Sequence, residues 1–169
     1  FLAVYNYIYM TSGNPKNCSS YPNKRKWDTD SHQMRLRTVR WLETHLNTEI
    51  VSGMGQVFRD YIEEDISGSR NSDMSVHGYL QRMKKRSIDA GQIEIVALAR
   101  LLNKNILVYA ERASEYQEIG QGFTHLPRNQ KNDIHILHMG RTMNKSQGAE
   151  HYEALVPRSL CKELGKTPK

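Results

Sequence analysis

The segment GQIEIVALARLLNKNILVY, residues 91–109, decides how this chain folds. Between Ile93 and Leu102, apolar residues fall on nearly every side of a helical wheel, and a helix that is apolar all round is a buried helix. The turn residues Asn103-Lys104-Asn105 end this pattern. The apolar, β-branched run Ile106–Tyr109 is typical of a buried strand. The sequence therefore predicts a central helix that leads into a core strand through a tight turn.

Helices are predicted in the part of the chain that precedes the central helix. The apolar spacing of residues 1–10 indicates a first helix, and the Gly-, Pro- and polar-rich residues 11–30 indicate a long loop. Ser31 is the expected N-cap of an amphipathic helix that runs to about Glu49. Two shorter helices are expected after it, over residues 56–64 and from Asp73 or Ser75 to Met83.

Strands are predicted in the part that follows it. Beyond residues 106–109 they are expected around 116–119, over 134–139 and over 151–156, with a helical turn over 159–164. Helices followed by strands, with one helix between, indicate an α+β fold with a small, mainly antiparallel sheet packed between helices. We expect a single domain over residues 1–157 and a C-terminal tail over 158–169.

Composition limits the classes of protein to consider. The length of 169 residues suits one domain. No apolar run approaches 18 residues, so no membrane span is expected, and the apolar start lacks the basic region of a signal peptide. A start at Phe1, within a helical pattern, suggests a piece of a longer protein. The net charge is +6, but its basic runs, such as 84–86, are short enough to be solvated surface.

The two cysteines, Cys18 and Cys161, lie far apart and show no metal-ligand spacing. A reducing, intracellular compartment is therefore expected. Cys18 lies in the predicted long loop and Cys161 in the terminal turn. Neither position offers the helix N-terminus that stabilises a thiolate, so neither cysteine is expected to be a nucleophile.

His151 and Glu153 stand two residues apart in a predicted strand, so both side chains would project to the same face. An imidazole oriented by a carboxylate is the base half of a Cys-His-acid or Ser-His-acid triad. Spacing alone favours the plainer interpretation, a surface pair at a strand edge. His135 and His138 are three apart, on opposite faces, and are expected to be structural. No cofactor or metal site is expected.

Several motifs, in order along the chain, resemble those of the ovarian-tumour (OTU) family of cysteine deubiquitinases. Phe1-Leu2-Ala3-Val4 resembles the F-R-A-V that follows the family's nucleophilic cysteine, and Ser31–Arg37 resembles its H-x-x-L/V-R helix start. The remaining motifs are residues 79–83, 91–98, 106–109 and His151-Tyr152. The resemblance covers the chain from Phe1 to about Pro157.

The resemblance implies a papain-like OTU cysteine protease fold with His151 as general base. Glu153 stands where many members carry the Asn or Asp that orients this base. The family's nucleophile lies in a D-G-x-C loop, which the match places about two residues before Phe1. At that point backbone N–H groups and the helix dipole would lower the thiol pKa and bind the oxyanion. The chain has no cysteine there, so as it stands we expect it to lack hydrolase activity.

The implied function is thiol-dependent hydrolysis of isopeptide or peptide bonds at the C-terminus of ubiquitin. The implied partner is ubiquitin, polyubiquitin or a ubiquitin-like modifier, in the cytoplasm or nucleus. One alternative is a catalytically dead, OTU-like module that binds ubiquitin through the helices of residues 31–83. A third is a basic nucleic-acid-binding domain, whose affinity would fall steeply with salt. It ranks last because the basic clusters include no aromatic stacking platform.

Overall fold

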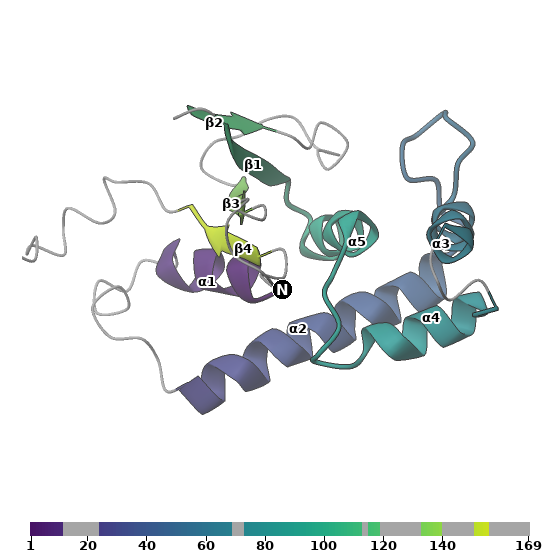
Figure 1. Ribbon diagram of the computed structural model, residues 1–169, viewed down its shortest axis with the longest axis horizontal. Helices are drawn as coiled ribbons and strands as arrows, with labels where there is room; N and C mark the ends of the chain where they lie inside the picture. The colour runs from purple at the N-terminus through teal and green to yellow at the C-terminus, as the bar shows by residue number, and fades with distance from the viewer. Residues whose placement is uncertain (12–23, 69–72, 113–114, 119–132, 140–150, 156–169) are drawn as a thin grey trace, which may run out of the picture.

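The computed structural model describes residues 1–11, 24–68, 73–112, 115–118, 133–139 and 151–155 (Figure 1). Helices come first, then strands, so the α+β class is confirmed. The helices are α1 (Leu2–Thr11), α2 (Lys24–His45), α3 (Phe58–Ser67), α4 (Val76–Met83) and α5 (Gln92–Leu102). The strands are β1 (Ile106–Arg112), β2 (Glu115–Glu118), β3 (Ile134–Met139) and β4 (His151–Ala154).

The central helix is buried as its all-round apolar pattern predicts. Every residue from Ile93 to Ala99 is buried, including Glu94. At its end Asn103 adopts the left-handed conformation, with φ of 51°, and its N–H bonds to the carbonyl of Arg100. This left-handed cap turns the chain directly into β1, whose residues Ile106–Val108 are also buried.

The sheet has the strand order β2-β1-β3-β4. Its outer pairs, β1·β2 and β3·β4, are antiparallel, but the central pair β1·β3 is parallel. The prediction of a mainly antiparallel sheet is therefore correct only for the outer pairs. A buried polar contact accounts for the parallel pair: Asn105, just before β1, donates a 3.0 Å hydrogen bond to Asp133, just before β3. This bond places the starts of the two strands side by side, with Ile106 opposite Ile134.

The helix boundaries differ from prediction mainly at α2. This helix begins at Lys24, so the predicted loop over residues 11–30 is too long and Ser31 is not an N-cap. Ser31 instead donates its hydroxyl to the carbonyl of Asp28, inside the helix. The prediction for Ser75 is confirmed, since its Oγ accepts a 3.1 Å bond from the N–H of Gly78 at the start of α4. The predicted turn over 159–164 lies outside the described residues.

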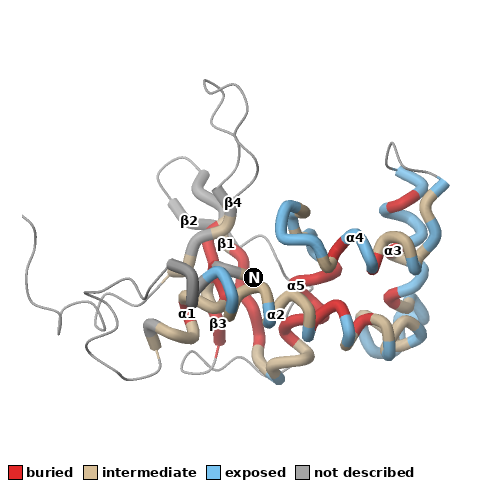
Figure 2. Tube along the Cα trace, turned by 90° about the horizontal axis from the view of Figure 1, so that it is seen from below, coloured by how far each residue is buried: buried red, intermediate tan, exposed pale blue. Residues whose placement is uncertain are grey.

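The elements separate into two ends joined by α2. The sheet and α1 gather at one end, and α3 and α4 lie at the other, while α5 packs on α2 between them (Figure 1). α1 contacts both β3 and β4, and α5 contacts β1. Buried residues form a continuous core through α5, β1, β3 and the middle of α2 (Figure 2). The start of α1 therefore lies at the junction of the sheet with α2 and α5.

Candidate active site

The site is built around the start of α1. The helix begins at Leu2, and the N–H of Tyr5 bonds to the carbonyl of Phe1 at 2.9 Å. The first N–H groups of a helix have no partner within it and carry the positive end of its dipole. Ala3 and Val4 are buried against the core, so packing fixes the direction in which these groups point.

Arg35 of α2 holds this helix start against its neighbours. Its guanidinium lies 4.8 Å from the centre of the Phe1 ring and donates a 3.1 Å hydrogen bond to the carbonyl of Met83, at the end of α4. Burial lowers the pKa of Arg35, and the negative charges of Glu94 and Asp89 oppose this effect. A partly desolvated arginine that stacks on a ring and binds a carbonyl resists displacement. Arg35 therefore connects α1, α2 and α4 at one point.

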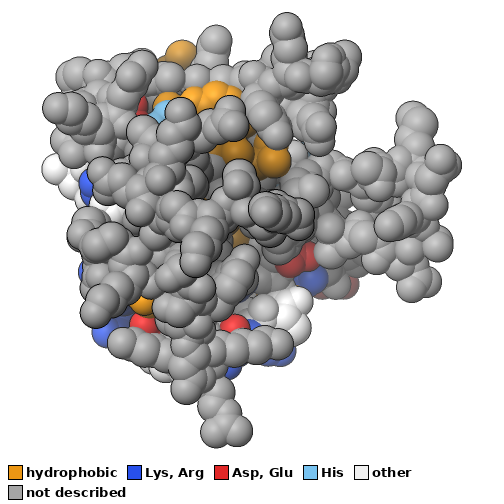
Figure 3. Space-filling view, turned by 90° about the vertical axis from the view of Figure 1, so that its left-hand side faces the viewer, with side chains coloured by type: hydrophobic (Ala, Val, Ile, Leu, Met, Phe, Trp, Pro, Cys, Tyr) orange, Lys and Arg blue, Asp and Glu red, His pale blue; other side chains and the backbone are white. Residues whose placement is uncertain are grey.

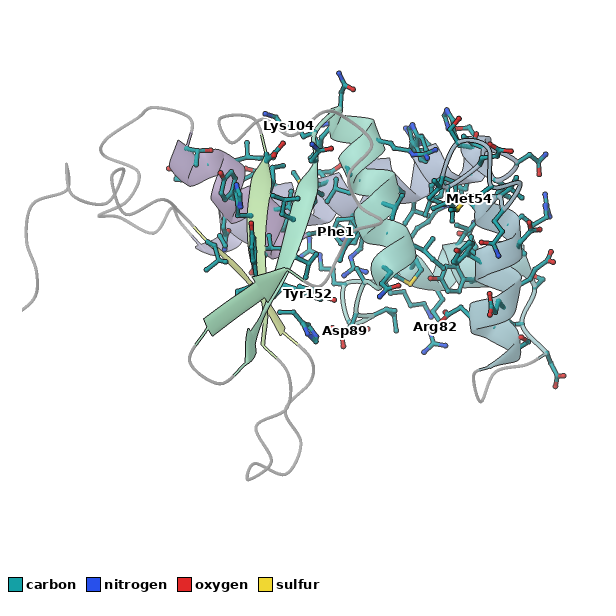
Figure 4. The ribbon with its side chains drawn as sticks, turned by 90° about the horizontal axis from the view of Figure 1, so that it is seen from above. Phe1, Met54, Arg82, Asp89, Lys104 and Tyr152 are labelled. Atoms are coloured by element: carbon teal, nitrogen blue, oxygen red, sulfur yellow. The ribbon has the colours of Figure 1, made fainter. Side chains whose placement is uncertain are left out.

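A pocket of about 400 Å³ opens at this point, and we name it the α1 pocket. Residues from α1, from α2, from the segment before α5 and from β4 line it: Phe1, Ala3, Asp28, Ser31, His32, Arg35, Arg86, Asp89, Ala90 and Tyr152. Figure 4 shows the labelled Phe1, Tyr152 and Asp89 close together between the sheet and α5. The lining combines positive and negative side chains with aromatic rings, and such a lining suits a polar ligand better than an apolar one.

His32 is a titratable group of this pocket with a partly buried side chain. Its Nδ1 atom is buried and has no hydrogen-bond partner among the described residues. Burial and the nearby positive charges of Arg86 and Arg35 lower its pKa below the usual 6.5. The imidazole is therefore neutral at neutral pH. Its unpartnered nitrogen can accept or donate one hydrogen bond, depending on the tautomer.

Behind the pocket, the start of α5 is fixed by a buried carboxylate. Glu94 accepts hydrogen bonds of 2.8 Å from the N–H of Gly91 and 2.8 Å from the hydroxyl of Tyr79. Burial raises the pKa of Glu94, although both hydrogen bonds act in the opposite direction. The same burial, with the neighbouring Glu94 charge, raises the pKa of Tyr79. This pair joins α4 to α5 and holds the segment that lines the pocket.

The two predicted catalytic residues, His151 and Glu153, lie in β4. Their backbones pair with Met139 and Leu137 of β3, so the predicted strand is present. Their side chains lie outside the described part of the structure, and the predicted pairing of imidazole and carboxylate stays a prediction. β4 itself contacts α1, and Tyr152, between the two residues, lines the α1 pocket.

The other histidines of the sheet occupy structural positions. His135 stacks with Tyr109 and receives or donates a 3.0 Å hydrogen bond through Nδ1, while His138 contacts the ring of Tyr152. No group of metal-binding side chains occurs among the described residues. Within the same residues, no helix is long and apolar enough to cross a membrane. Cys18 and Cys161 lie outside the described residues.

The molecular surface at this end is mixed in character. Figure 3 views the molecule from the end that α1 occupies and shows hydrophobic side chains with a histidine beside them, framed by atoms that are not described. Charged side chains of both signs lie along the lower edge of the same view. This surface therefore presents both apolar and charged groups.

Three of the six segments singled out for their resemblance to OTU motifs contribute residues to the lining of the α1 pocket. Phe1 and Ala3 belong to the first motif, His32 and Arg35 to the second, and Tyr152 to the last, and all of them line this pocket. Comparison with protein-family models, with curated proteins and with solved structures found no match to this chain. With no related protein to compare, the observation that bears on function is that segments distant in sequence line one pocket.

Sequence reasoning placed His32, Arg35, Tyr79 and Glu94 in the OTU-like motifs but gave none of them a role of its own. A polar residue within an amphipathic helix is usually solvent-exposed, so the pattern gives little warning that Arg35 is a structural contact. Glu94 did leave a signal, because a carboxylate three residues after the N-cap Gly91, in an otherwise apolar helix, can accept from the N–H of the N-cap, which is one half of a capping box. Its burial follows from that local bond.

Proposed function

We propose that this chain is the part of an OTU-type cysteine deubiquitinase that carries the general base and the substrate pocket. The supporting observation is that segments as distant in sequence as Phe1, Arg35 and Tyr152 line one pocket of about 400 Å³ at the start of α1. The pocket lies at a helix start and beside the strand that bears His151, and the proposal rests on this proximity.

The proposal assigns the nucleophile to a cysteine about two residues before Phe1 in the parent protein. A thiol at the N-terminal end of α1 would lie in the positive field of the helix, which favours the thiolate. The same unpaired N–H groups would stabilise the oxyanion that forms during attack on a carbonyl. Arg35 would act only indirectly, by holding the helix start in place.

The reaction then follows the thiol-protease sequence. His151 removes the thiol proton, and the sulfur attacks the carbonyl carbon of the final residue of ubiquitin. The C–N bond to the substrate amine breaks as His151 returns the proton to that nitrogen, which leaves a thioester. His151 next takes a proton from water, whose oxygen attacks the thioester and releases the ubiquitin carboxylate and the thiol. Glu153 would orient the imidazole through a hydrogen bond.

The experiment compares two proteins, the chain 1–169 and the same chain preceded by whatever residues its gene encodes upstream of Phe1. Each is incubated with di-ubiquitin and with a ubiquitin probe that carries a thiol-reactive tail. We expect cleavage and labelling only for the longer protein. His151→Ala should abolish cleavage, whereas His77→Ala, at an exposed position of α4, should leave it unchanged.

Any other outcome of these cleavage and labelling experiments would favour one of the alternatives. Cleavage by residues 1–169 alone would contradict the upstream nucleophile and direct attention to Cys18. Binding of ubiquitin by both proteins without cleavage or labelling would indicate a ubiquitin-binding module. Binding of RNA or DNA that weakens steeply with salt, without ubiquitin binding, would support the basic nucleic-acid-binding domain.

A further inference from the structure

A second and larger hollow lies between α3 and α5, away from the α1 pocket, and we name it the α3–α5 cleft. Its volume is about 640 Å³, and it shares no lining residue with the α1 pocket. Ile50, Ile93 and Val96 give it an apolar floor, while Glu64 and Asp65 of α3 contribute carboxylates to its lining. The cleft therefore combines a place for an apolar group with negative charge beside it.

The polar side chains of the cleft can accept hydrogen bonds but have little capacity to donate them, whereas at its α5 edge the backbone N–H groups of Gln92 and Ile93 lie in the first turn of the helix and can donate. The hydroxyl of Tyr61 already donates to Gln56 at 2.9 Å, and that of Tyr79 already donates to Glu94 at 2.8 Å. Among side chains, the amide of Gln92 is the remaining donor in the lining. Carboxylates are acceptors only when ionised. Beside Glu64 and Asp65 a ligand must therefore bring donors, and a cation suits these two carboxylates best.

The charge of this region is opposite to that of the whole chain. The chain carries a net charge of +6, yet α3 has the sequence FRDYIEEDIS, in which acidic residues outnumber the single arginine. Glu64 and Asp65 are exposed, and neither makes an ion pair with any of the described residues. Asp65 also raises the pKa values of Tyr79 and Glu94 behind the cleft. The negative field thus extends into the cleft.

Apolar side chains beside the cleft are unusually exposed. Val51, which lines it, is 40% exposed, and Met54 on the same loop is 70% exposed. These are the large hydrophobic residues that the described part of the chain leaves in solvent. Figure 4 places Met54 on the far side of α5 from Tyr152. Exposed apolar side chains next to a cleft are typical of an interaction site.

We propose that the α3–α5 cleft binds a short peptide segment of a partner protein in which lysine or arginine alternates with apolar side chains. An apolar side chain would occupy the floor, and the adjacent cation would pair with Glu64 or Asp65. Charge complementarity selects this occupant, because an acidic segment would be repelled and a purely apolar one would leave both carboxylates without a partner. The binding does not depend on the deubiquitinase reaction.

The test measures fluorescence anisotropy of a labelled hexapeptide that alternates leucine and lysine, titrated with the chain 1–169. Two further peptides replace the lysines with glutamates or the leucines with serines. We expect saturable binding of the leucine–lysine peptide, weakening as salt rises above physiological strength, and binding of both other peptides weaker by about tenfold or more.

Matched variants locate the site on the protein. Glu64→Gln with Asp65→Asn removes both carboxylate charges without changing side-chain size, and should weaken binding by about three- to tenfold. Glu63→Gln makes the same change at an exposed position of the same helix that does not line the cleft, and should leave binding within about twofold of the original. Val51→Thr should weaken binding without changing the net charge.

Three results would overturn the proposal. The first is no binding of the leucine–lysine peptide at millimolar protein, and the second is equal binding of the glutamate peptide. The third is an equal effect of Glu63→Gln and of the double variant. Sedimentation that shows a dimer, abolished by the double variant, would assign the cleft to a second copy of this chain instead. None of these results alters the expected cleavage of di-ubiquitin, so the two proposals fail independently.

Discussion

At the scale of single residues, Glu94 is a buried carboxyl whose charge the fold disfavours. Burial raises its pKa above the usual 4.5, so the folded state favours the protonated form. This contribution to stability is complete below the unfolded pKa and is lost as pH rises through the folded pKa. Glu94→Gln should keep both hydrogen bonds, since the amide can accept from Gly91 and donate to Tyr79, but it carries no charge.

We therefore expect the free energy of unfolding of the original protein to fall, relative to Glu94→Gln, as pH rises from 4 to 8. Urea titrations followed by tryptophan fluorescence at several pH values measure this difference. Glu94→Ala, which loses both bonds, should cost about 1–3 kcal/mol. Parallel pH profiles for the original protein and Glu94→Gln would show that the carboxyl is not desolvated as described.

Arg35 supports a second prediction at this scale. Arg35→Ala removes the contact with the Phe1 ring and the hydrogen bond to the carbonyl of Met83, and should reduce stability by about 1–3 kcal/mol. Arg37→Ala, at an exposed position one half-turn further along α2, should change it by less than about 0.5 kcal/mol. Equal effects of the two substitutions in a urea titration would refute the role assigned to Arg35.

At the scale of elements, the end of α5 depends on the left-handed conformation of Asn103. Asn103→Val should cost about 1–2 kcal/mol, because a β-branched side chain is strained at positive φ. Asn103→Gly should be neutral or stabilising by up to about 1 kcal/mol, since glycine adopts this conformation without strain. Thermal unfolding of the three proteins gives this order. A destabilised glycine variant would contradict it.

Elements with strong local patterns were predictable from sequence. The all-round apolar pattern of α5, the turn at Asn103 and the cap at Ser75 each depend on neighbours in the chain, and each is confirmed. The predicted start of α2, at Ser31, was wrong because the polar residues before it carry no apolar periodicity that would distinguish a solvent-exposed helix from a loop.

The parallel pairing of β1 with β3 was also beyond reach of the sequence pattern, because it depends on a contact between Asn105 and Asp133 across 28 positions. The candidate site was only partly predictable for the same reason. His151 and Glu153 were found from their spacing, whereas the pocket forms from segments that only the fold brings together.

At the scale of the whole molecule, the order of the strands predicts where the fold opens first. Among the strands that the structure describes, β4 has a partner, β3, on one side only, whereas β1 and β3 each have partners on both sides. Amide hydrogen exchange should therefore be slowest in α5, β1 and β3, where opening requires unfolding of the core, and faster in β4. Exchange in peptides covering residues 134–139 and 151–154, measured by mass spectrometry, tests this. Equal rates in both would contradict the described topology.

The α1 pocket and the α3–α5 cleft are separated by one short backbone segment, residues 89–91. Asp89 and Ala90 face the α1 pocket, whereas Gly91, the next residue, faces the α3–α5 cleft. Glu94 holds this backbone segment in place by accepting the hydrogen bond from the N–H of Gly91. The α1 pocket and the α3–α5 cleft therefore lie on either side of one short segment, and Glu94→Ala, which removes the bond to Gly91, should disturb the lining of both.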